Sequence, residues 1–190
     1  MKQVYVIHGY TASASDHWFP YLKNQLNQKN IACVCLNMPN SMAPTASEWL
    51  DYLKQHIQLN EHTIVVGHSL GCIVTINFLL TQQQKILSGI FVSGFNQQIP
   101  HLPELNSFLA TYQTFLAESK KPLSELFNQV PCAISAFNDH IIPHQYTDAL
   151  AKDLQADYIR LQQGGHFLAR EGWHEFPLVL EKIKTYFKNE

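Results

Sequence analysis

A serine flanked by two glycines follows directly on an apolar strand-like run, and this arrangement limits the folds open to the chain. Residues 63–66 read Thr-Ile-Val-Val, residues 67–71 read Gly-His-Ser-Leu-Gly, and a helix-like run occupies 72–80. A serine at such a strand-to-helix turn projects its hydroxyl above the sheet edge, and the glycines remove side chains that would collide there. The pattern predicts a nucleophile elbow, with Ser69 as the nucleophile.

Two later strand-like runs are followed by the partners that a serine nucleophile needs. A hydroxyl is weak at neutral pH, so an imidazole must take its proton and a carboxylate must orient the imidazole. Asp139 follows the run at 131–137, and His166 lies in the loop after the run at 158–161. Open α/β sheets place their sites at the carboxyl ends of the strands, so we expect these residues to meet Ser69 there.

Each partner also has a purely structural interpretation. Asp139 alone reads equally well as a carboxylate that forms a turn or caps a helix. Asp148 and Asp153 are rival acids, but both fall within the helix predicted over 145–154. His166 alone is explained as an ordinary loop histidine, yet no other histidine follows a strand so late in the chain. We therefore prefer Asp139 and His166.

Backbone amides near the elbow are candidates for an oxyanion hole, because the negative charge on a reacting carbonyl oxygen needs preorganised donors. One is the N–H of Leu70, directly after the nucleophile, and the second is the N–H of Tyr10, in the loop after the run at 4–7. His8 is expected to support that loop rather than to catalyse. The residues expected to line the substrate pocket are His68, Ser93, Phe95 and Phe167.

Strand-like and helix-like segments alternate along the chain, which indicates an α/β domain with a parallel sheet. A helix capped at residues 15 and 16 is predicted to run to about Lys29, and another to start at Thr45 or Ser47. The chain has no repeats or linkers, and residues 1–190 are expected to form one domain. The predicted strands are 4–7, 32–36, 63–66, 89–93, 133–137 and 158–161.

Residues 95–130 are too long for a simple crossover, and they contain a helix-like apolar pattern between Leu105 and Leu116. One interpretation is an amphipathic helix that packs on the sheet. The other is a partial cap, with residues 96–98 at an entrance and with Phe108 and Phe115 forming a wall of the acyl pocket. Both interpretations remain open from the sequence.

The chain resembles the α/β-hydrolase superfamily along nearly its whole length. Within it, the resemblance is to the small branch of serine hydrolases that includes retinoblastoma-binding protein 9 and short bacterial hydrolases. The resemblance is carried by residues 7–10, 15–18, 38–40, Trp49 with Leu50, 67–71, Asp139 with Pro143, and 165–167.

The resemblance implies a three-layer fold with a reduced, mostly parallel sheet of about six strands in the order 2-1-3-4-5-6. It also implies a carboxylesterase-like activity with a triad of Ser69, Asp139 and His166. One departure concerns partners: the Leu-x-Cys-x-Glu sequence associated with pocket-protein binding is absent, since residues 70–74 read Leu-Gly-Cys-Ile-Val. A retinoblastoma-type partner is therefore not expected.

Composition and charge favour a small-molecule enzyme. A hydrophobic content of 46% over 190 residues suffices for a substantial core. The net charge is -2 without blocks of like charge, so neither nucleic acid nor a membrane is an expected partner. The chain enters a strand at once and has no apolar run near the roughly 18 residues of a membrane span, so we expect a cytoplasmic protein.

The cysteines and histidines give no sign of a disulfide, metal or cofactor. Cys33, Cys35, Cys72 and Cys132 lie in or beside apolar runs and are predicted to be buried thiols. The ten histidines include no His-Glu-x-x-His sequence. Pro143 separates His140 from His144, which argues against a shared helical face. We therefore predict no metal and no cofactor.

The prediction from the sequence is a serine hydrolase that cleaves small esters through an acyl-serine intermediate. The same machinery would serve an amidase or a thioesterase. A binding protein that kept a hydrolase fold without turnover is the alternative from another class, because a fold alone does not establish a function.

Overall fold

The fold is built on one sheet of six strands, and the computed structural model describes it over residues 1–189. Every neighbouring pair of strands is parallel, and the spatial order is β2-β1-β3-β4-β5-β6. The order expected from the resemblance is therefore confirmed. The strands are β1 (Gln3–Ile7), β2 (Ala32–Leu36), β3 (Thr63–His68), β4 (Ser88–Val92), β5 (Cys132–Ala136) and β6 (Asp157–Leu161).

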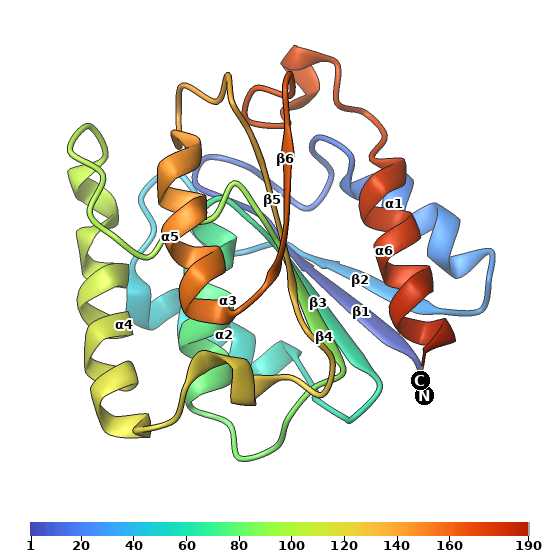
Figure 1. The fold of residues 1–190 in the computed structure, drawn as a ribbon, viewed down its shortest axis with the longest axis horizontal. Coiled ribbons are helices and arrows are strands. Elements are labelled where there is room, and N and C mark those ends of the chain that lie inside the picture. The colour runs from blue at the N-terminus through green and yellow to red at the C-terminus, as the bar shows by residue number, and fades with distance from the viewer. Residues whose placement is uncertain (190) are drawn as a thin grey trace.

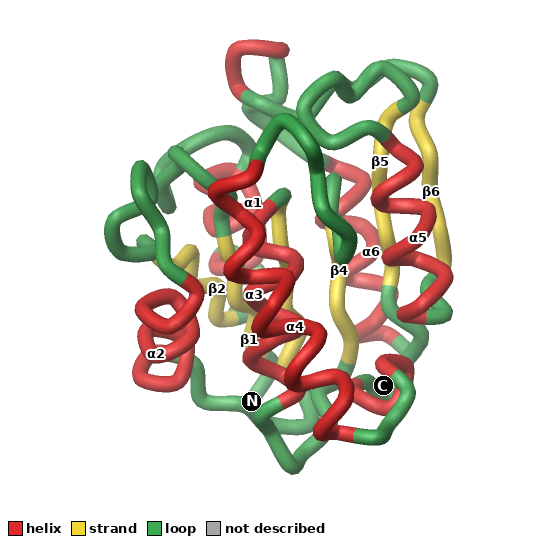
Figure 2. The backbone as a smooth tube through the Cα atoms, turned by 90° about the vertical axis from the view of Figure 1, so that its left-hand side faces the viewer, coloured by secondary structure: helices red, strands yellow, loops and turns green. Residues whose placement is uncertain are grey.

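Helices cover both faces of the sheet and complete three layers. Figure 1 shows α1 (Phe19–Asn27) and α6 (Pro177–Lys188) on one face. The other face carries α2 (Ala46–His56), α3 (Leu70–Leu80), α4 (Asn106–Ser119) and α5 (His144–Leu154), with α4 lying outside α3 (Figures 1 and 2). Three short 3₁₀ helices are η1 (Pro103–Leu105), η2 (Leu123–Leu126) and η3 (Ala169–Glu171). None of these helices is long and apolar enough to cross a membrane.

Side chains that alternate along the strands divide the core into two clusters, one on each face of the sheet. In β1, Tyr5 and Ile7 pack toward α2 and α3, whereas Val4 and Val6 pack toward α1 and α6. All positions of β3, β4 and β5 are buried, while the edge strands β2 and β6 include exposed positions. The turn that carries Ser69 therefore follows β3, a central strand that is buried on both faces.

The starts of two helices show where local sequence patterns do and do not decide structure. Thr45 caps α2 as predicted, because its Oγ1 accepts a 3.3 Å hydrogen bond from the N–H of Glu48. The helix predicted from residues 15 and 16 begins later, at Phe19. Asp16 instead accepts a 2.7 Å hydrogen bond from the N–H of Ser13, so this carboxylate closes a turn ahead of the helix.

The long segment 95–130 forms η1, α4 and η2, and α4 packs against α2 and α3. Phe108 is fully buried with its ring 5.9 Å from that of Trp49. Asn77 Nδ2 also donates a 3.0 Å hydrogen bond to the carbonyl of Phe108, which fixes α4 on α3. Phe115 lies over the groove between α2 and α4. Neither phenylalanine reaches the cavity described below, so the expected wall formed by these two rings is absent.

All four cysteines are free thiols. Cys33, Cys72 and Cys132 are buried, and Cys35 is half-buried on the edge strand β2. Burial raises the pKa of the Cys132 thiol to about 11 and also raises that of Cys72, so neither thiol has the character of a nucleophile.

Candidate active site

Ser69 occupies a strained turn between β3 and α3. Its backbone angles are φ 55° and ψ -122°, a conformation that non-glycine residues seldom adopt and that sites often retain for function. A Cβ on Gly67 would lie 2.8 Å from Cys72 Cα, and one on Gly71 would collide with the carbonyl oxygen of Ile7. The glycines therefore allow the chain to turn back tightly, and the strand, turn and helix predicted around Ser69 are all present.

The predicted acid and base are hydrogen bonded to each other. His166 Nδ1–H donates to Asp139 Oδ2 at 2.8 Å, and Ser93 Oγ donates to the same oxygen at 2.8 Å. Asp139 Oδ1 accepts 2.9 Å hydrogen bonds from the amides of Ile141 and Ile142. The buried carboxylate is thus held by four donors, and it fixes the imidazole in the tautomer whose Nε2 is free to take a proton.

The rival acids are committed to other partners. Asp148 accepts hydrogen bonds from the Tyr158 hydroxyl and, at 2.7 Å, from Arg160. Asp153 accepts a 2.7 Å hydrogen bond from Asn96 Nδ2. Neither carboxylate contacts the imidazole of the acid–base pair, so Asp139 alone is placed to orient it.

Two backbone amides near Ser69 remain without an acceptor. Within the described residues, the N–H groups of Tyr10 and Leu70 donate to no other group. Leu70 is the first residue of α3, where the helix dipole gives the amide a partial positive character. Gly9 brings the other amide close, since a Cβ at Gly9 would lie 2.9 Å from Ser69 Cβ. Two amides near Ser69 that have no acceptor within the described residues are candidates for an oxyanion hole.

His8 braces the loop that carries the Tyr10 amide. Its Nδ1–H donates to the carbonyl of Gly9 at 2.8 Å, and its Nε2 accepts from the N–H of Met38 at 3.0 Å. Burial lowers the pKa of His8, which favours the neutral ring that this pair of hydrogen bonds requires. Both ring nitrogens are engaged, so His8 is placed as the structural support that the sequence suggested.

Ser69 and His166 line one cavity of about 550 Å³ at the carboxyl ends of the strands. Its apolar lining comes from Ala12, Leu102, Leu105, Ile141 and Leu168. Its ionisable lining comes from Asp16, His17, His101, His140 and Arg170. The cavity therefore combines a hydrophobic wall with a polar mouth, as small-molecule sites commonly do.

Ser69 Oγ makes no hydrogen bond within the described residues. Attack on a substrate needs this oxygen within about 2.6–3.2 Å of the His166 Nε2 that takes its proton. Catalytic hydrogen bonds are commonly long in ligand-free enzymes and tighten when substrate binds. Ser69 and His166 line the same cavity. A small movement when substrate binds would bring Oγ and Nε2 within hydrogen-bond distance.

Of the residues expected to line the substrate pocket, only His68 does so. Ser93 is fully buried and hydrogen bonded to the acid. Phe95 is fully buried in the core beside α3, and Phe167 stacks on Phe176 with ring centroids 5.0 Å apart. Phe167 has a backbone φ of 59°, and its side chain is buried in the core. The sequence did not predict this orientation.

Two residues that the sequence did not single out hold the loop of the base. Asn138 Oδ1 accepts 2.9 Å hydrogen bonds from the amides of Gly164 and Gly165. Glu171 Oε2 accepts a 2.9 Å hydrogen bond from the N–H of His166. No spacing rule marks these contacts, although the position of Asn138 directly before the predicted acid was a weak signal.

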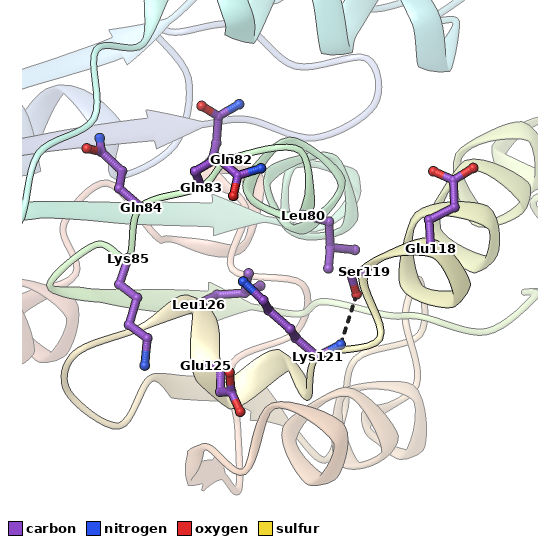
Figure 3. Close-up of a pocket in the computed structure, with 10 residues that line it drawn as sticks. All are labelled: Leu80, Gln82, Gln83, Gln84, Lys85, Glu118, Ser119, Lys121, Glu125 and Leu126. Atoms are coloured by element: carbon purple, nitrogen blue, oxygen red, sulfur yellow. Dashed lines mark hydrogen bonds between the residues drawn. The ribbon is translucent and has the colours of Figure 1, made fainter.

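Another pocket lies at the far end of α3 from the nucleophile (Figure 3). Its lining mixes Lys85 and Lys121 with Glu118 and Glu125, and helix α3 separates it from Ser69 by roughly 16 Å. The described residues contain no group of three or more His, Cys, Asp or Glu side chains arranged to hold a metal ion. Ser69 and His166 line the cavity at the other end of α3, where Asp139 is hydrogen bonded to His166.

Comparisons with known proteins extend over nearly the whole chain. Residues 4–185 match the family described as "Serine hydrolase". The chain is 39% identical to YdeN of Bacillus subtilis (strain 168), over 100% of this chain and 98% of that protein. It is 25% identical to the serine hydrolase RBBP9 of Rattus norvegicus, over 90% of this chain and 89% of that protein.

Solved structures show the same fold. The crystal structure of the ydeN gene product from B. subtilis superposes with a TM-score of 0.90 at 38% identity, over 99% of this chain and 100% of that one. Est1E from Butyrivibrio proteoclasticus superposes with a TM-score of 0.70 at 16% identity, over 99% and 87% of the two chains. The second likeness concerns the fold alone.

Proposed function

The chain belongs to the serine hydrolase family, and from that premise we propose that it cleaves small carboxylic esters through an acyl-serine intermediate. Ser69 is the nucleophile, His166 transfers protons and Asp139 orients His166. The observation that carries the proposal is the 2.8 Å hydrogen bond from His166 Nδ1 to Asp139 Oδ2, beside a serine held in a strained elbow. Membership of the family establishes a hydrolase, and the choice of ester bonds is the proposed part.

Acylation begins when Ser69 Oγ attacks the carbonyl carbon of the ester and His166 Nε2 takes the hydroxyl proton. The carbonyl oxygen becomes an oxyanion, which accepts hydrogen bonds from the amides of Tyr10 and Leu70. The tetrahedral intermediate collapses as the carbon–oxygen bond to the alcohol breaks. His166 then gives its proton to the departing alkoxide, and the acyl group remains on Ser69.

Deacylation repeats the sequence with water. His166 Nε2 takes a proton from a water molecule as its oxygen attacks the acyl carbon, and the same amides stabilise the second oxyanion. Collapse of this intermediate releases the carboxylic acid, and the proton on His166 returns to Ser69 Oγ. Asp139 stays ionised throughout and stabilises the imidazolium that forms in both half-reactions.

The cavity supports small, partly apolar substrates. Leu102, Leu105 and Leu168 provide a wall on which an acyl chain can be buried, at about 0.8 kcal/mol per methylene. The polar mouth suits the alcohol part of the ester or solvent. Thioesters and amides would use the same groups, and they differ in the leaving group that His166 must protonate.

The proposal is tested with a fluorophosphonate probe and with p-nitrophenyl esters of graded chain length. The wild-type protein should be labelled and should turn over the esters, whereas Ser69→Ala should lose both properties and keep its circular dichroism spectrum. Ser47→Ala is the control, because Ser47 is exposed on α2 away from the cavity. Equal labelling of the Ser69→Ala variant would overturn the assignment of the nucleophile.

Matched ester, thioester and anilide substrates with one acyl group decide the bond type. We expect the highest kcat/KM for the ester. A folded wild-type protein that binds these compounds without labelling or turnover would instead be a binding protein on a hydrolase fold.

A further inference from the structure

His68, the residue before the nucleophile, reaches across to the backbone of the base. Its Nε2–H donates a 2.8 Å hydrogen bond to the carbonyl oxygen of His166. Because a carbonyl only accepts, His68 Nε2 must carry a proton. Nδ1 is buried and has no partner within the described residues. A proton on Nδ1 would be buried without an acceptor, so the contact and the unpartnered Nδ1 together favour the neutral Nε2–H tautomer of His68.

The surroundings of His68 favour a neutral ring. The side chain is 1% exposed, and the rings of His17, Trp18 and Phe19 meet it edge to face at 5.6, 6.0 and 5.8 Å. Burial, followed by the nearby charge of His166, lowers the pKa of His68 well below its usual value. The two histidine rings are only 5.0 Å apart, so a charged His68 would oppose the imidazolium that forms on His166.

We propose that His68 is a positioning residue that sets the distance between the nucleophile and the base. The proposal rests on the function proposed above. His68 is covalently joined to Ser69 and hydrogen bonded to the carbonyl of His166, while Glu171 holds the N–H of the same residue at 2.9 Å. Both backbone polar groups of His166 are thus hydrogen bonded, and one of these hydrogen bonds comes from the residue before Ser69.

This link matters because, within the described residues, no hydrogen bond of the His166 ring reaches Ser69. The side chain of His166 is hydrogen bonded to Asp139, which lies in the loop after β5. Ser69 Oγ makes no hydrogen bond within the described residues. A displacement of about 1 Å between catalytic groups can lower a rate about 10²-fold. The hydrogen bond from His68 connects the elbow directly to the base loop and can hold the two in register.

Two carboxamide variants test the bond itself. In His68→Gln the amide nitrogen can reach the place of Nε2 and still donate to the His166 carbonyl, whereas in His68→Asn it reaches only the place of Nδ1. We expect kcat for p-nitrophenyl esters to fall about 10²-fold in His68→Asn, with little change in KM. His68→Gln should keep kcat within about fivefold of wild type.

Nuclear magnetic resonance of ¹⁵N-histidine-labelled protein gives a readout independent of turnover. Wild-type His68 should show the Nε2–H tautomer between pH 5 and 8. The His166 Nδ1–H signal should persist in His68→Gln and broaden or vanish in His68→Asn. Equal kcat values in the two variants, or a charged or Nδ1–H form of His68 in the wild type, would overturn the proposal even if a variant folds poorly.

Failure of the proposed function would look different. If the wild type shows the expected tautomer and a sharp His166 Nδ1–H signal but hydrolyses no ester, the positioning role stands and the ester assignment falls. If esters are hydrolysed and both variants keep wild-type kcat, the hydrolase assignment stands and the role of His68 falls.

Discussion

Ser93 Oγ donates a 2.8 Å hydrogen bond to Asp139 Oδ2, the oxygen that also accepts from the imidazole of the base. Ser93 follows β4, and its N–H donates to the carbonyl of Ile134 in β5 at 2.8 Å. The acid is therefore held by groups from the neighbouring strand as well as by its own loop. This arrangement makes Ser93 part of the support of the acid rather than of the substrate pocket.

Replacement of Ser93 by Ala should weaken the orientation of the acid without removing it. Hydrogen bonds to charged groups contribute about 1.5–3 kcal/mol, so we expect kcat to fall about tenfold or more while KM changes little. Kinetics on one p-nitrophenyl ester, with thermal unfolding of both proteins, measures this. A variant with unchanged kcat and reduced stability would limit Ser93 to a structural role.

Asp139→Asn should lower kcat by several orders of magnitude, up to ~10⁴-fold, because the amide favours the wrong tautomer of His166. Asp148→Asn and Asp153→Asn are matched controls, since their carboxylates bind Tyr158 and Asn96 instead. Steady-state kinetics on all three variants decides the acid. A large loss in Asp148→Asn with normal activity in Asp139→Asn would contradict the assignment.

Leu105 and Phe108 should respond differently to truncation although they lie on adjacent turns. Leu105 lines the cavity, so Leu105→Ala should shift preference toward longer acyl chains, by up to about 0.8 kcal/mol for each methylene buried. Phe108 is fully buried against Trp49, so Phe108→Ala should cost roughly 3–5 kcal/mol of stability. Chain-length profiles of kcat/KM and denaturant unfolding of both variants test this, and a shifted profile in Phe108→Ala would contradict it.

Stability should fall as the solution becomes acidic. Burial lowers the pKa of His8, His17 and His68 in the folded protein, whereas an unfolded histidine has a pKa of about 6.5. Below about pH 6.5 these histidines bind protons in the unfolded chain but stay neutral in the folded chain until a lower pH. The stability present above about pH 6.5 is therefore lost as pH falls. Each histidine contributes a slope of at most about 1.4 kcal/mol per pH unit.

Thermal unfolding between pH 8 and pH 5 measures this slope. His8→Gln should flatten it, because one group that resists protonation is removed. His174→Gln is the control at an exposed position. A melting temperature that rises as pH falls from 6.5 would contradict the prediction.

The sequence pattern predicted the strands and the convergence of Ser69, Asp139 and His166, because each residue follows a strand at the same sheet edge. The order of the strands came from the resemblance. It did not predict the placement of Phe95 and Phe167. Whether an aromatic ring after a strand turns into the core or toward a cavity depends on backbone angles and on packing partners that lie far away in the sequence. The contact of His68 with the carbonyl of His166 is unpredictable for the same reason, because the two residues are 98 positions apart. Glu171 is close to His166 in the sequence, but its contact depends on how the loop between them folds.

Ser69 and His166, the proposed nucleophile and base, also differ in how firmly the sheet holds them. Ser69 leaves the central strand β3, whereas His166 leaves β6, an edge strand that pairs with β5 alone and has no fully buried position. Edge elements open locally at lower free energy than the interior of a fold. Brief detachment of this last strand would carry the base away while the rest of the sheet stays folded. Hydrolysis would therefore be lost on local opening of this edge, before the rest of the molecule unfolds.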